Sequence, residues 1–195
     1  MTSIILAGGK GNRIGKEKAF IKIGNKTIIE RIIDVLSNLF EDIIVVAKNQ
    51  ELYKDFNVKV TEDIIPNLGP LGGLYSGLLK SNTFHNLVLA SDMPFINPSF
   101  VNYMKGKIDD YDILIPAIDE RTEPLHAIYS KRCLEAIKNR LDKGLLSMQS
   151  FFSDVKVRYI LKEEIESFDP NYRMFFNVNT KDDVEEANRI VEEIP

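Results

Sequence analysis

The chain of 195 residues contains one cysteine, Cys133, and two histidines, His85 and His126. A single cysteine excludes an internal disulfide and a cysteine-based zinc cluster, as expected in a reducing compartment. Cys133 lies in an apolar helical pattern, which favours a packed thiol over a nucleophile. The two histidines are too far apart in sequence for an H-x-x-x-H pair, and no G-x-S-x-G motif is present. The sequence therefore predicts neither a histidine-based catalyst nor a serine hydrolase.

Long apolar runs and basic blocks are also absent. The longest purely apolar run, Ile43 to Ala47, is far too short to span a bilayer. The 25 basic and 29 acidic residues give a net charge of -4, and no basic block is long enough to form a nucleic-acid footprint. No basic segment precedes the short apolar start Ile4 to Ala7, which predicts a first strand and not a secretory signal. We therefore expect a cytoplasmic protein that binds neither membranes nor nucleic acid.

The composition is that of a globular protein. Hydrophobic residues make up 44% and charged residues 28% of the chain, with 11 glycines and 8 prolines. The length fits one domain, residues 1–195, which can bury about 70% of the surface that its unfolded chain exposes.

Short β-branched runs alternate with longer helical patterns along the chain. Such alternation predicts βαβ units, and hence an α/β fold with a mostly parallel central sheet. The expected strands are Thr2 to Leu6, Asp42 to Ala47, Val58 to Thr61, Asn86 to Ser91, Asp112 to Ala117, Leu125 to Ser130 and Val155 to Leu161.

Three helix starts can be recognised from the sequence. Thr27 and Glu30 form a capping box ahead of an apolar stripe, and Asn97 is an N-cap followed by proline. Thr180 is expected to begin an acidic helix over Lys181 to Glu192, with its acids on a solvated face. Ligands of open α/β sheets bind beyond the carboxyl ends of the strands, so the informative residues should follow strands.

The first such segment is the glycine loop, Leu6 to Lys18. Its four glycines let main-chain N–H groups approach a phosphate, while Arg13, Lys16 and Lys18 supply positive charge. The dinucleotide pattern G-x-G-x-x-G would need a small residue at Ile14, and the P-loop pattern fails at two positions. The loop predicts an anion cradle of another type, against the alternative of an exposed glycine turn.

The second segment runs from Asp63 to Leu74. Two prolines and three glycines predict a fixed loop that leads into a helix near Leu74 to Lys80. Asp63 ends the preceding strand. Its carboxylate could accept hydrogen bonds from a ribose or a base edge, or it could cap a turn, and the sequence leaves both open.

The third segment, Ser91 to Phe95, follows an apolar strand. Asp92 stands where a sheet presents a metal or phosphate ligand, and its hard oxygen suits Mg²⁺. The alternative is that Asp92 caps a turn onto Pro98. Asn97 already supplies that cap, which favours a functional Asp92.

Five motifs together resemble the molybdenum cofactor guanylyltransferase family of the nucleotide-diphospho-sugar transferase superfamily. The family's opening motif is similar to L-A-G-G-x-S-x-R-M-G-x-D-K, and Gly11, Ile14 and Glu17 depart from it here. Gly11 replaces a serine, which removes one hydroxyl contact and leaves the main-chain cradle. The other four matching motifs are Gly69-Pro70-Leu71-Gly72-Gly73, Ser91-Asp92-Met93-Pro94-Phe95, Pro124-Leu125-His126-Ala127-Ile128-Tyr129 and Asn177-Val178-Asn179-Thr180.

The resemblance implies a Rossmann-like three-layer α/β/α fold and transfer of GMP from GTP to the terminal phosphate of molybdenum-loaded molybdopterin. The products would be the guanine dinucleotide cofactor and pyrophosphate. A phosphate monoester is largely ionised near pH 7, so the acceptor needs no general base. The resemblance also implies transient contacts with proteins that deliver the molybdenum cofactor.

The resemblance further implies roles for particular residues. Lys18 and Arg13 would neutralise the triphosphate, and Asp92 would hold Mg²⁺ against nucleotide oxygens. Asp63 would hold the guanine and ribose together with main-chain groups, which come from Leu6, Ala7, Gly8 and Gly9.

Asn177 and Asn179 would face the acceptor pterin, with the alternative that Asn179 completes the metal site. His126 would lie in the wall of the acceptor site and hydrogen-bond there.

Two other function classes stay open on the sequence. A cytidylyltransferase or sugar-phosphate nucleotidyltransferase would share the glycine loop and the metal carboxylate. A non-catalytic nucleotide-binding subunit would not need both Lys18 and Asp92, and their presence together disfavours it.

Overall fold

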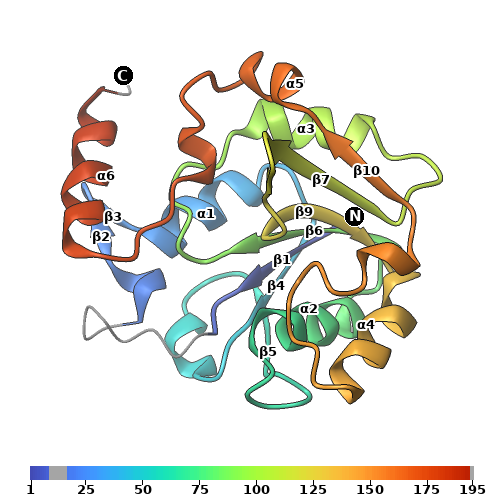
Figure 1. Cartoon of the computed structure of the whole chain (residues 1–195). Coiled ribbons are helices and arrows are strands. Elements are labelled where there is room, and N and C mark those ends of the chain that lie inside the picture. Colours follow the sequence, from blue (N-terminus) through green and yellow to red (C-terminus); the bar gives the residue numbers. More distant parts are fainter. Residues whose placement is uncertain (9–16, 194–195) are drawn as a thin grey trace.

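The computed structural model describes residues 1–8 and 17–193 of the chain. Its main sheet follows the order β10-β7-β9-β6-β1-β4-β5, and the short strand β8 pairs with β7 (Figure 1). The strands of this sheet are β1 (Thr2–Leu6), β4 (Asp42–Val46), β5 (Lys59–Thr61), β6 (His85–Ala90), β7 (Ile113–Ile118), β8 (Arg121–Thr122), β9 (His126–Ser130) and β10 (Val157–Ile160). A separate hairpin pairs β2 (Lys22–Ile23) with β3 (Lys26–Thr27).

Most neighbours in the main sheet are parallel. β1 pairs in parallel with both β4 and β6, β4 with β5, and β10 with β7. β9 is the exception, because it runs antiparallel to both β6 and β7. The start of β9 therefore lies at the same edge of the sheet as the carboxyl ends of β1 and β6.

Helices cover both faces of the sheet (Figure 1). Side chains of α1 and α3 pack with one set of strand residues, and side chains of α2 and α4 pack with the other. The helices are α1 (Ile28–Leu36), α2 (Gly69–Lys80), α3 (Pro98–Gly106), α4 (Cys133–Asp142), α5 (Lys162–Glu166) and α6 (Lys181–Glu193). The predicted three-layer arrangement is confirmed. Among the helices described, none is long and apolar enough to cross a membrane.

The central strands β1, β4 and β6 are rich in apolar residues because both of their faces are buried. In β1, for example, Ile4 packs in the cluster with α2 and Ile5 in the cluster with α1. A strand buried on both sides needs no alternation of polar residues. For this reason the β-branched runs located most strands to within one or two residues.

The helix starts follow the predicted caps. The Thr27 hydroxyl accepts a hydrogen bond from the Glu30 amide at 3.3 Å, and the Thr27 amide donates to the Glu30 carboxylate at 2.5 Å. The Asn97 side chain accepts from the amides of Ser99 and Phe100 at 3.0 and 3.1 Å. The Thr180 hydroxyl accepts from the Asp183 amide at 3.2 Å, so all three predicted helix starts are confirmed.

Helix α2 begins at Gly69, five residues before the predicted start near Leu74. A proline in the first turn loses no helical hydrogen bond, so Pro70 is compatible with this start. Asn67 and Gly69 have φ values of 66° and 65°, so the left-handed turn lies between Pro66 and Pro70, where α2 begins. The prediction was wrong because it treated glycine and proline here as loop residues.

Gly77 brings α2 into direct contact with β1. A Cβ at this position would lie 2.5 Å from Cγ2 of the fully buried Ile4. We expect Gly77→Ala to lower the free energy of unfolding by about 1–3 kcal/mol, the usual cost of overpacking a core. Urea unfolding followed by circular dichroism measures the change.

Gly106→Ala is the matched control, because a Cβ at Gly106 in α3 meets no atom within 4 Å. Alanine favours a helix over glycine, so this variant should be as stable as the wild type or slightly more so. Equal destabilisation by both substitutions would contradict the close packing of α2 on β1.

Candidate active site

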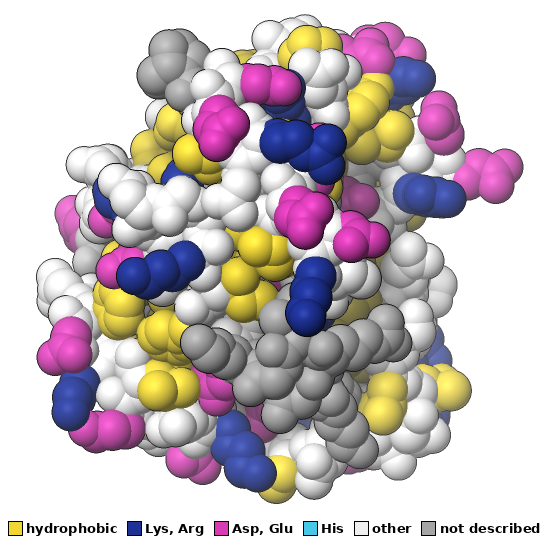
Figure 2. All heavy atoms as spheres, turned by 90° about the vertical axis from the view of Figure 1, so that its left-hand side faces the viewer, with side chains coloured by type: hydrophobic (Ala, Val, Ile, Leu, Met, Phe, Trp, Pro, Cys, Tyr) yellow, Lys and Arg dark blue, Asp and Glu magenta, His cyan; other side chains and the backbone are white. Residues whose placement is uncertain are grey.

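The candidate site lies at the edge of the sheet where β1 and β6 end. The Ser91 amide donates to the Leu6 carbonyl at 3.2 Å, and the Ala90 amide donates to the Leu125 carbonyl at 3.0 Å. The segments after β1 and β6 and before β9 are therefore neighbours. This edge faces the left in Figure 1 and the viewer in Figure 2, where basic and acidic side chains are interspersed.

Three predicted residues meet at this edge. Nζ of Lys18, at the start of the short helix Lys18–Phe20, lies 3.4 Å from Oδ2 of Asp92 and also donates to the side-chain oxygen of Asn179. Asp92 is 74 residues from Lys18 in sequence, and Asn179 is 161 residues away. We call these three residues the Lys18–Asp92–Asn179 cluster.

The Asp92 carboxylate is largely withdrawn from water, with 20% of its side chain exposed. Burial raises its pKa, and the Lys18 ammonium opposes part of that rise. The Val178 amide donates to the Asp92 main-chain carbonyl at 2.9 Å, which fixes the segment carrying Asn179 to the end of β6. A desolvated carboxylate beside an amide oxygen forms a local site for a cation.

Asp183 positions Asn179 from the first turn of α6. Its carboxylate accepts hydrogen bonds from the amides of Asn179 at 2.8 Å and Thr180 at 2.7 Å. These main-chain bonds lower the pKa of Asp183. The prediction of a solvated acidic face did not include this capping role. A carboxylate at the third helical position can accept hydrogen bonds from N–H groups at and before the N-cap.

Of the predicted nucleotide residues, Leu6, Ala7 and Gly8 lie at the end of β1 or directly after it. The Ala7 amide donates to the Val46 carbonyl at 2.9 Å, and Gly8 is exposed, with no atom of the described residues within 4 Å of an added Cβ. Gly9 and Arg13 lie outside the described residues. The roles of all these residues stay predictions.

Asp63 is a half-buried acid, and one of its carboxylate oxygens has no hydrogen-bond partner among the described residues. That oxygen, Oδ1, is shielded from solvent, and burial raises the pKa of Asp63. A Cβ at Gly73 would lie 3.5 Å from this oxygen and 3.4 Å from Leu6, so the carboxylate lies beside the end of β1. The turn-cap alternative finds no hydrogen bond to support it among the described residues.

Asn177 does not join the Lys18–Asp92–Asn179 cluster. Its side-chain NH₂ donates to the Phe175 carbonyl at 2.9 Å, and this contact does not use the side-chain oxygen. The next residue toward the N-terminus, Phe176, lines a separate cleft. Of the two predicted acceptor amides, only Asn179 reaches Lys18.

That cleft, which we call the hairpin cleft, has a volume of about 930 Å³. It lies between the β7–β8 hairpin, the turn around Tyr172 and helix α6. Its lining residues are Ile118, Asp119, Glu120, Arg121, Glu123, Asn171, Tyr172, Arg173, Phe175, Phe176, Glu186, Ile190 and Glu193. Burial raises the pKa of Glu123, and Arg121 opposes that rise. Sequence reasoning missed Glu123, although it stands directly before the Pro124 motif.

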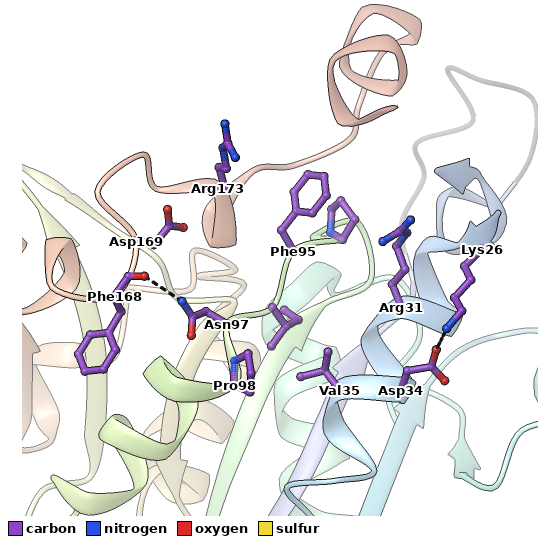
Figure 3. A pocket seen from close by; sticks show the side chains of 12 residues that line it. Lys26, Arg31, Asp34, Val35, Phe95, Asn97, Pro98, Phe168, Asp169 and Arg173 are labelled. Carbon is purple, nitrogen blue, oxygen red and sulfur yellow. Dashed lines mark hydrogen bonds and ion pairs between the residues drawn. The ribbon is translucent and has the colours of Figure 1, made fainter. Parts of the chain in front are cut away.

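A second groove, of about 500 Å³, lies between α1 and α3 (Figure 3). Its basic side chains are already engaged. Lys26 pairs with Asp34 at 2.6 Å, and Arg31 donates twice to the Ile23 carbonyl, at 3.0 and 2.8 Å. Arg173, which borders both spaces, donates to the Glu193 carboxylate. This groove therefore offers few free charges to an anionic ligand.

His126 packs in the core. It is fully buried, with ring centroids 5.9 Å from Phe100 and 5.1 Å from Phe175. Burial lowers its pKa to about 4, so the ring is neutral at pH 7. The expectation that His126 forms part of the wall of the acceptor site was wrong, because the alternating strand β9 turns this side chain into the α3 layer.

The sheet order, the glycine-rich segment after β1 and the Lys18–Asp92–Asn179 cluster define a nucleotide-binding α/β domain. The chain belongs to the MobA-like NTP transferase domain family, which matches residues 3–157. A molybdenum cofactor guanylyltransferase of Desulfosudis oleivorans is 32% identical over 193 residues, covering 98% of this chain and 96% of that protein. The resemblance inferred from the five motifs is confirmed.

Solved structures support the same assignment. Molybdopterin-guanine dinucleotide biosynthesis protein A from Archaeoglobus fulgidus superposes with a TM-score of 0.88 at 27% identity, over 100% of both chains. The 4-diphosphocytidyl-2C-methyl-D-erythritol synthase of Anaerococcus prevotii matches with a TM-score of 0.70 at 15% identity, over 98% of this chain and 97% of that one. The second likeness shows the fold alone.

The contact between Lys18 and Asp92 predicts a measurable titration shift. Lys18→Met removes the cation that lowers the pKa of Asp92 and keeps most of the side chain's length, so that pKa should rise. Titration of the Asp92 carboxyl carbon by NMR, assigned through Asp92→Asn, measures the change. Lys54→Met, whose partner is Glu51 at 2.5 Å, is the control and should leave Asp92 unaffected. An unchanged pKa in the Lys18 variant would mean that the pair does not persist in solution.

Proposed function

We propose that this protein transfers GMP from GTP to the terminal phosphate of molybdenum-loaded molybdopterin. The products are the guanine dinucleotide form of the cofactor and pyrophosphate. The observation that carries this proposal is the Lys18–Asp92–Asn179 cluster, in which an ammonium, the carboxylate that follows β6 and an amide oxygen meet. The name of the relative from Desulfosudis oleivorans supports the choice of substrates.

The reaction is a substitution at the α-phosphorus of GTP. An ionised oxygen of the acceptor phosphate forms the new P–O bond, and the bond from the α-phosphorus to the oxygen bridging the β-phosphate breaks. Pyrophosphate leaves with that bond's electron pair. Since the acceptor is already an anion near pH 7, the protein's task is positioning and neutralisation of charge.

Charge neutralisation falls to Lys18, with Arg13 as its predicted partner. Asp92 and the side-chain oxygen of Asn179 would hold Mg²⁺, because this ion is commonly bound by one or two protein carboxylates together with substrate phosphates. The raised pKa of Asp92 supports that assignment, since a bound cation would restore the charge stabilisation lost on burial. When bound, Mg²⁺ would polarise the phosphate oxygens.

The two substrates would occupy opposite sides of this cluster. The main chain of Leu6 to Gly9 and the carboxylate of Asp63 would hold the guanosine, and Asn177 would face the acceptor. The buried, unpartnered oxygen of Asp63 supports its role, because a ligand N–H or O–H would supply the missing hydrogen bond. A cytoplasmic location for the reaction accords with the single cysteine.

Asp92→Asn should lower kcat by about 10² or more, because a neutral amide binds Mg²⁺ poorly at the reacting phosphate. Product formation from GTP and molybdopterin, measured by mass spectrometry at limiting Mg²⁺, tests this. Asp142→Asn is the control, since Asp142 pairs on the surface of α4 with Lys138 at 2.5 Å. Near-normal turnover by the Asp92 variant would remove this carboxylate from the mechanism.

The wild-type protein should prefer GTP to CTP by about 10² or more when both compete at equal concentration. A site that pairs the N1–H and 2-amino groups of guanine leaves its polar groups unpaired when cytosine enters, and such groups cost about 1–3 kcal/mol each. Analysis of the dinucleotide products by mass decides the base. A dominant cytosine product would favour the cytidylyltransferase alternative. If neither dinucleotide forms, a non-catalytic nucleotide-binding subunit would be favoured.

A further inference from the structure

Glu123 presents an unpaired carboxylate from a fixed piece of main chain. Its amide donates to the Pro116 carbonyl at 3.0 Å, and its carbonyl accepts from the His126 amide at 3.0 Å. The side chain is half-buried in the hairpin cleft, and among the described residues its carboxylate makes no hydrogen bond or ion pair. A withdrawn acid without a partner is costly unless a ligand supplies donors.

The charge of the hairpin cleft favours a ligand part that donates hydrogen bonds. Five acids line it against two arginines, and one of those arginines, Arg173, is paired with Glu193. This surplus of negative charge repels a phosphate. It favours a neutral ring with N–H groups at its edge.

The cleft also offers aromatic surface. Phe176 and Tyr172 line it while only half-buried, and Phe175 lies beneath them with 7% of its surface exposed. Aromatic side chains pack well against a flat ring system. The combination of flat apolar surface and one carboxylate is typical of a pocket for a planar heterocycle.

Two planar heterocycles of the proposed reaction carry the same donor edge, an amino group beside a ring N–H. These are guanine and the pterin of the acceptor. The strand order separates them, because β6 with Asp92 lies between β1 on one side and β9 on the other. Leu6, Gly8 and Asp63 lie on the β1 side, whereas Glu123 lies in the short segment that connects β8 to β9. The carboxylate is therefore on the acceptor side.

We infer that Glu123 selects the acceptor by accepting two hydrogen bonds from the 2-amino and N3–H groups of its pterin ring, bound in the hairpin cleft. This inference rests on the proposed function. A carboxylate has two acceptor oxygens and no donor, which matches that edge. The ring's phosphate-bearing side chain would then extend past Phe176 toward Lys18. Phe176 is two residues before Val178, whose amide is hydrogen-bonded to the main-chain carbonyl of Asp92.

The first test uses the wild-type protein and two small probes. We expect 6-hydroxymethylpterin to bind at least about tenfold more tightly than 6-hydroxymethyllumazine, in which an oxo group replaces the 2-amino group and faces the carboxylate. Probe fluorescence anisotropy gives both dissociation constants without any turnover. Equal affinities would overturn the inference even if every variant failed to fold.

The second test uses Glu123→Gln, whose amide offers one acceptor and one donor. The preference for pterin over lumazine should fall by about tenfold, while the KM for GTP stays within about twofold of the wild type. Glu123→Asp keeps both acceptor oxygens and should retain part of the preference. Glu185→Gln is the control for charge alone, because Glu185 is an exposed acid of α6 that does not line the cleft.

Each contrary result has a definite meaning. An unchanged preference in Glu123→Gln, or an equal loss in Glu185→Gln, would overturn the assignment of Glu123. A raised KM for GTP with unchanged pterin binding would assign the Glu123 carboxylate to guanine, and this result would also overturn the inference. If the wild-type protein forms no dinucleotide at all, the proposed function fails, whereas normal transfer by a variant that keeps its pterin preference rejects this inference alone.

Discussion

The burial of Asp92 at the end of β6 is the constraint around which the site is arranged. Withdrawing a carboxylate from water is unfavourable unless positive charge or hydrogen-bond donors replace the water. Lys18 supplies the charge, and its ammonium also binds Asn179. One interaction therefore connects the segment after the glycine loop, the central strand and the start of α6. Asp183 adds rigidity by holding the main chain of Asn179.

The reversed strand β9 divides the ligand-binding edge into two parts. In an all-parallel sheet, the ligand-binding edge would carry only segments that follow strands. The segments after β1 and β5 are of this kind, and they lie on one side of Asp92. Because β9 runs antiparallel to β6, the segment before it, with Glu123, comes to the same edge. A transferase that joins two substrates needs two binding regions that meet at one reacting centre. The mixed sheet supplies them without a second sheet.

The sequence predicted the elements whose local rules agree with their tertiary surroundings. β1 and the capped starts of α1 and α3 were located because buried strands and N-caps leave clear patterns. The hairpin β2–β3 and strand β8 were missed, since two-residue strands have no periodicity. The start of α2 was misplaced because Gly69 and Pro70 favour turns as well as first helical turns.

The residues of the candidate site also fall into those that the sequence could predict and those that only the fold shows. Lys18, Asp63 and Asp92 could be named from the sequence because each follows or ends a strand within a recognisable motif. Asn179 could be named only from the family resemblance, and its contact with Lys18 depends on chain segments 161 residues apart. Glu123 and Asp183 have no local pattern that separates them from surface acids, and only the fold shows that one is withdrawn in a cleft while the other caps a helix.

The direction of the pKa shift distinguishes an acid that caps a helix, such as Asp183, from an acid that is withdrawn in a cleft, such as Glu123. Main-chain N–H groups lower the pKa of Asp183. Burial raises the pKa of Asp112, but hydrogen bonds from the Lys156 amide, Arg132 and Ser130 outweigh it, so that pKa is lowered as well. Acids with lowered pKa values stabilise the fold above their unfolded pKa and lose that contribution as the pH falls.

Glu17, Asp63, Asp92 and Glu123 behave in the opposite way, because burial raises each pKa. A raised pKa means that the folded chain binds the proton more tightly than the unfolded chain, so these ionised acids oppose folding at neutral pH. This penalty shrinks as the pH falls through their folded pKa values toward the unfolded ones. All four lie at or beside the edge where β1 and β6 end and β9 begins. Lys18 offsets only part of the rise at Asp92, and Oδ1 of Asp63 has no partner among the described residues, so a ligand would supply what these acids lack. The gathering of such acids at one edge is an argument for the site that does not depend on any motif.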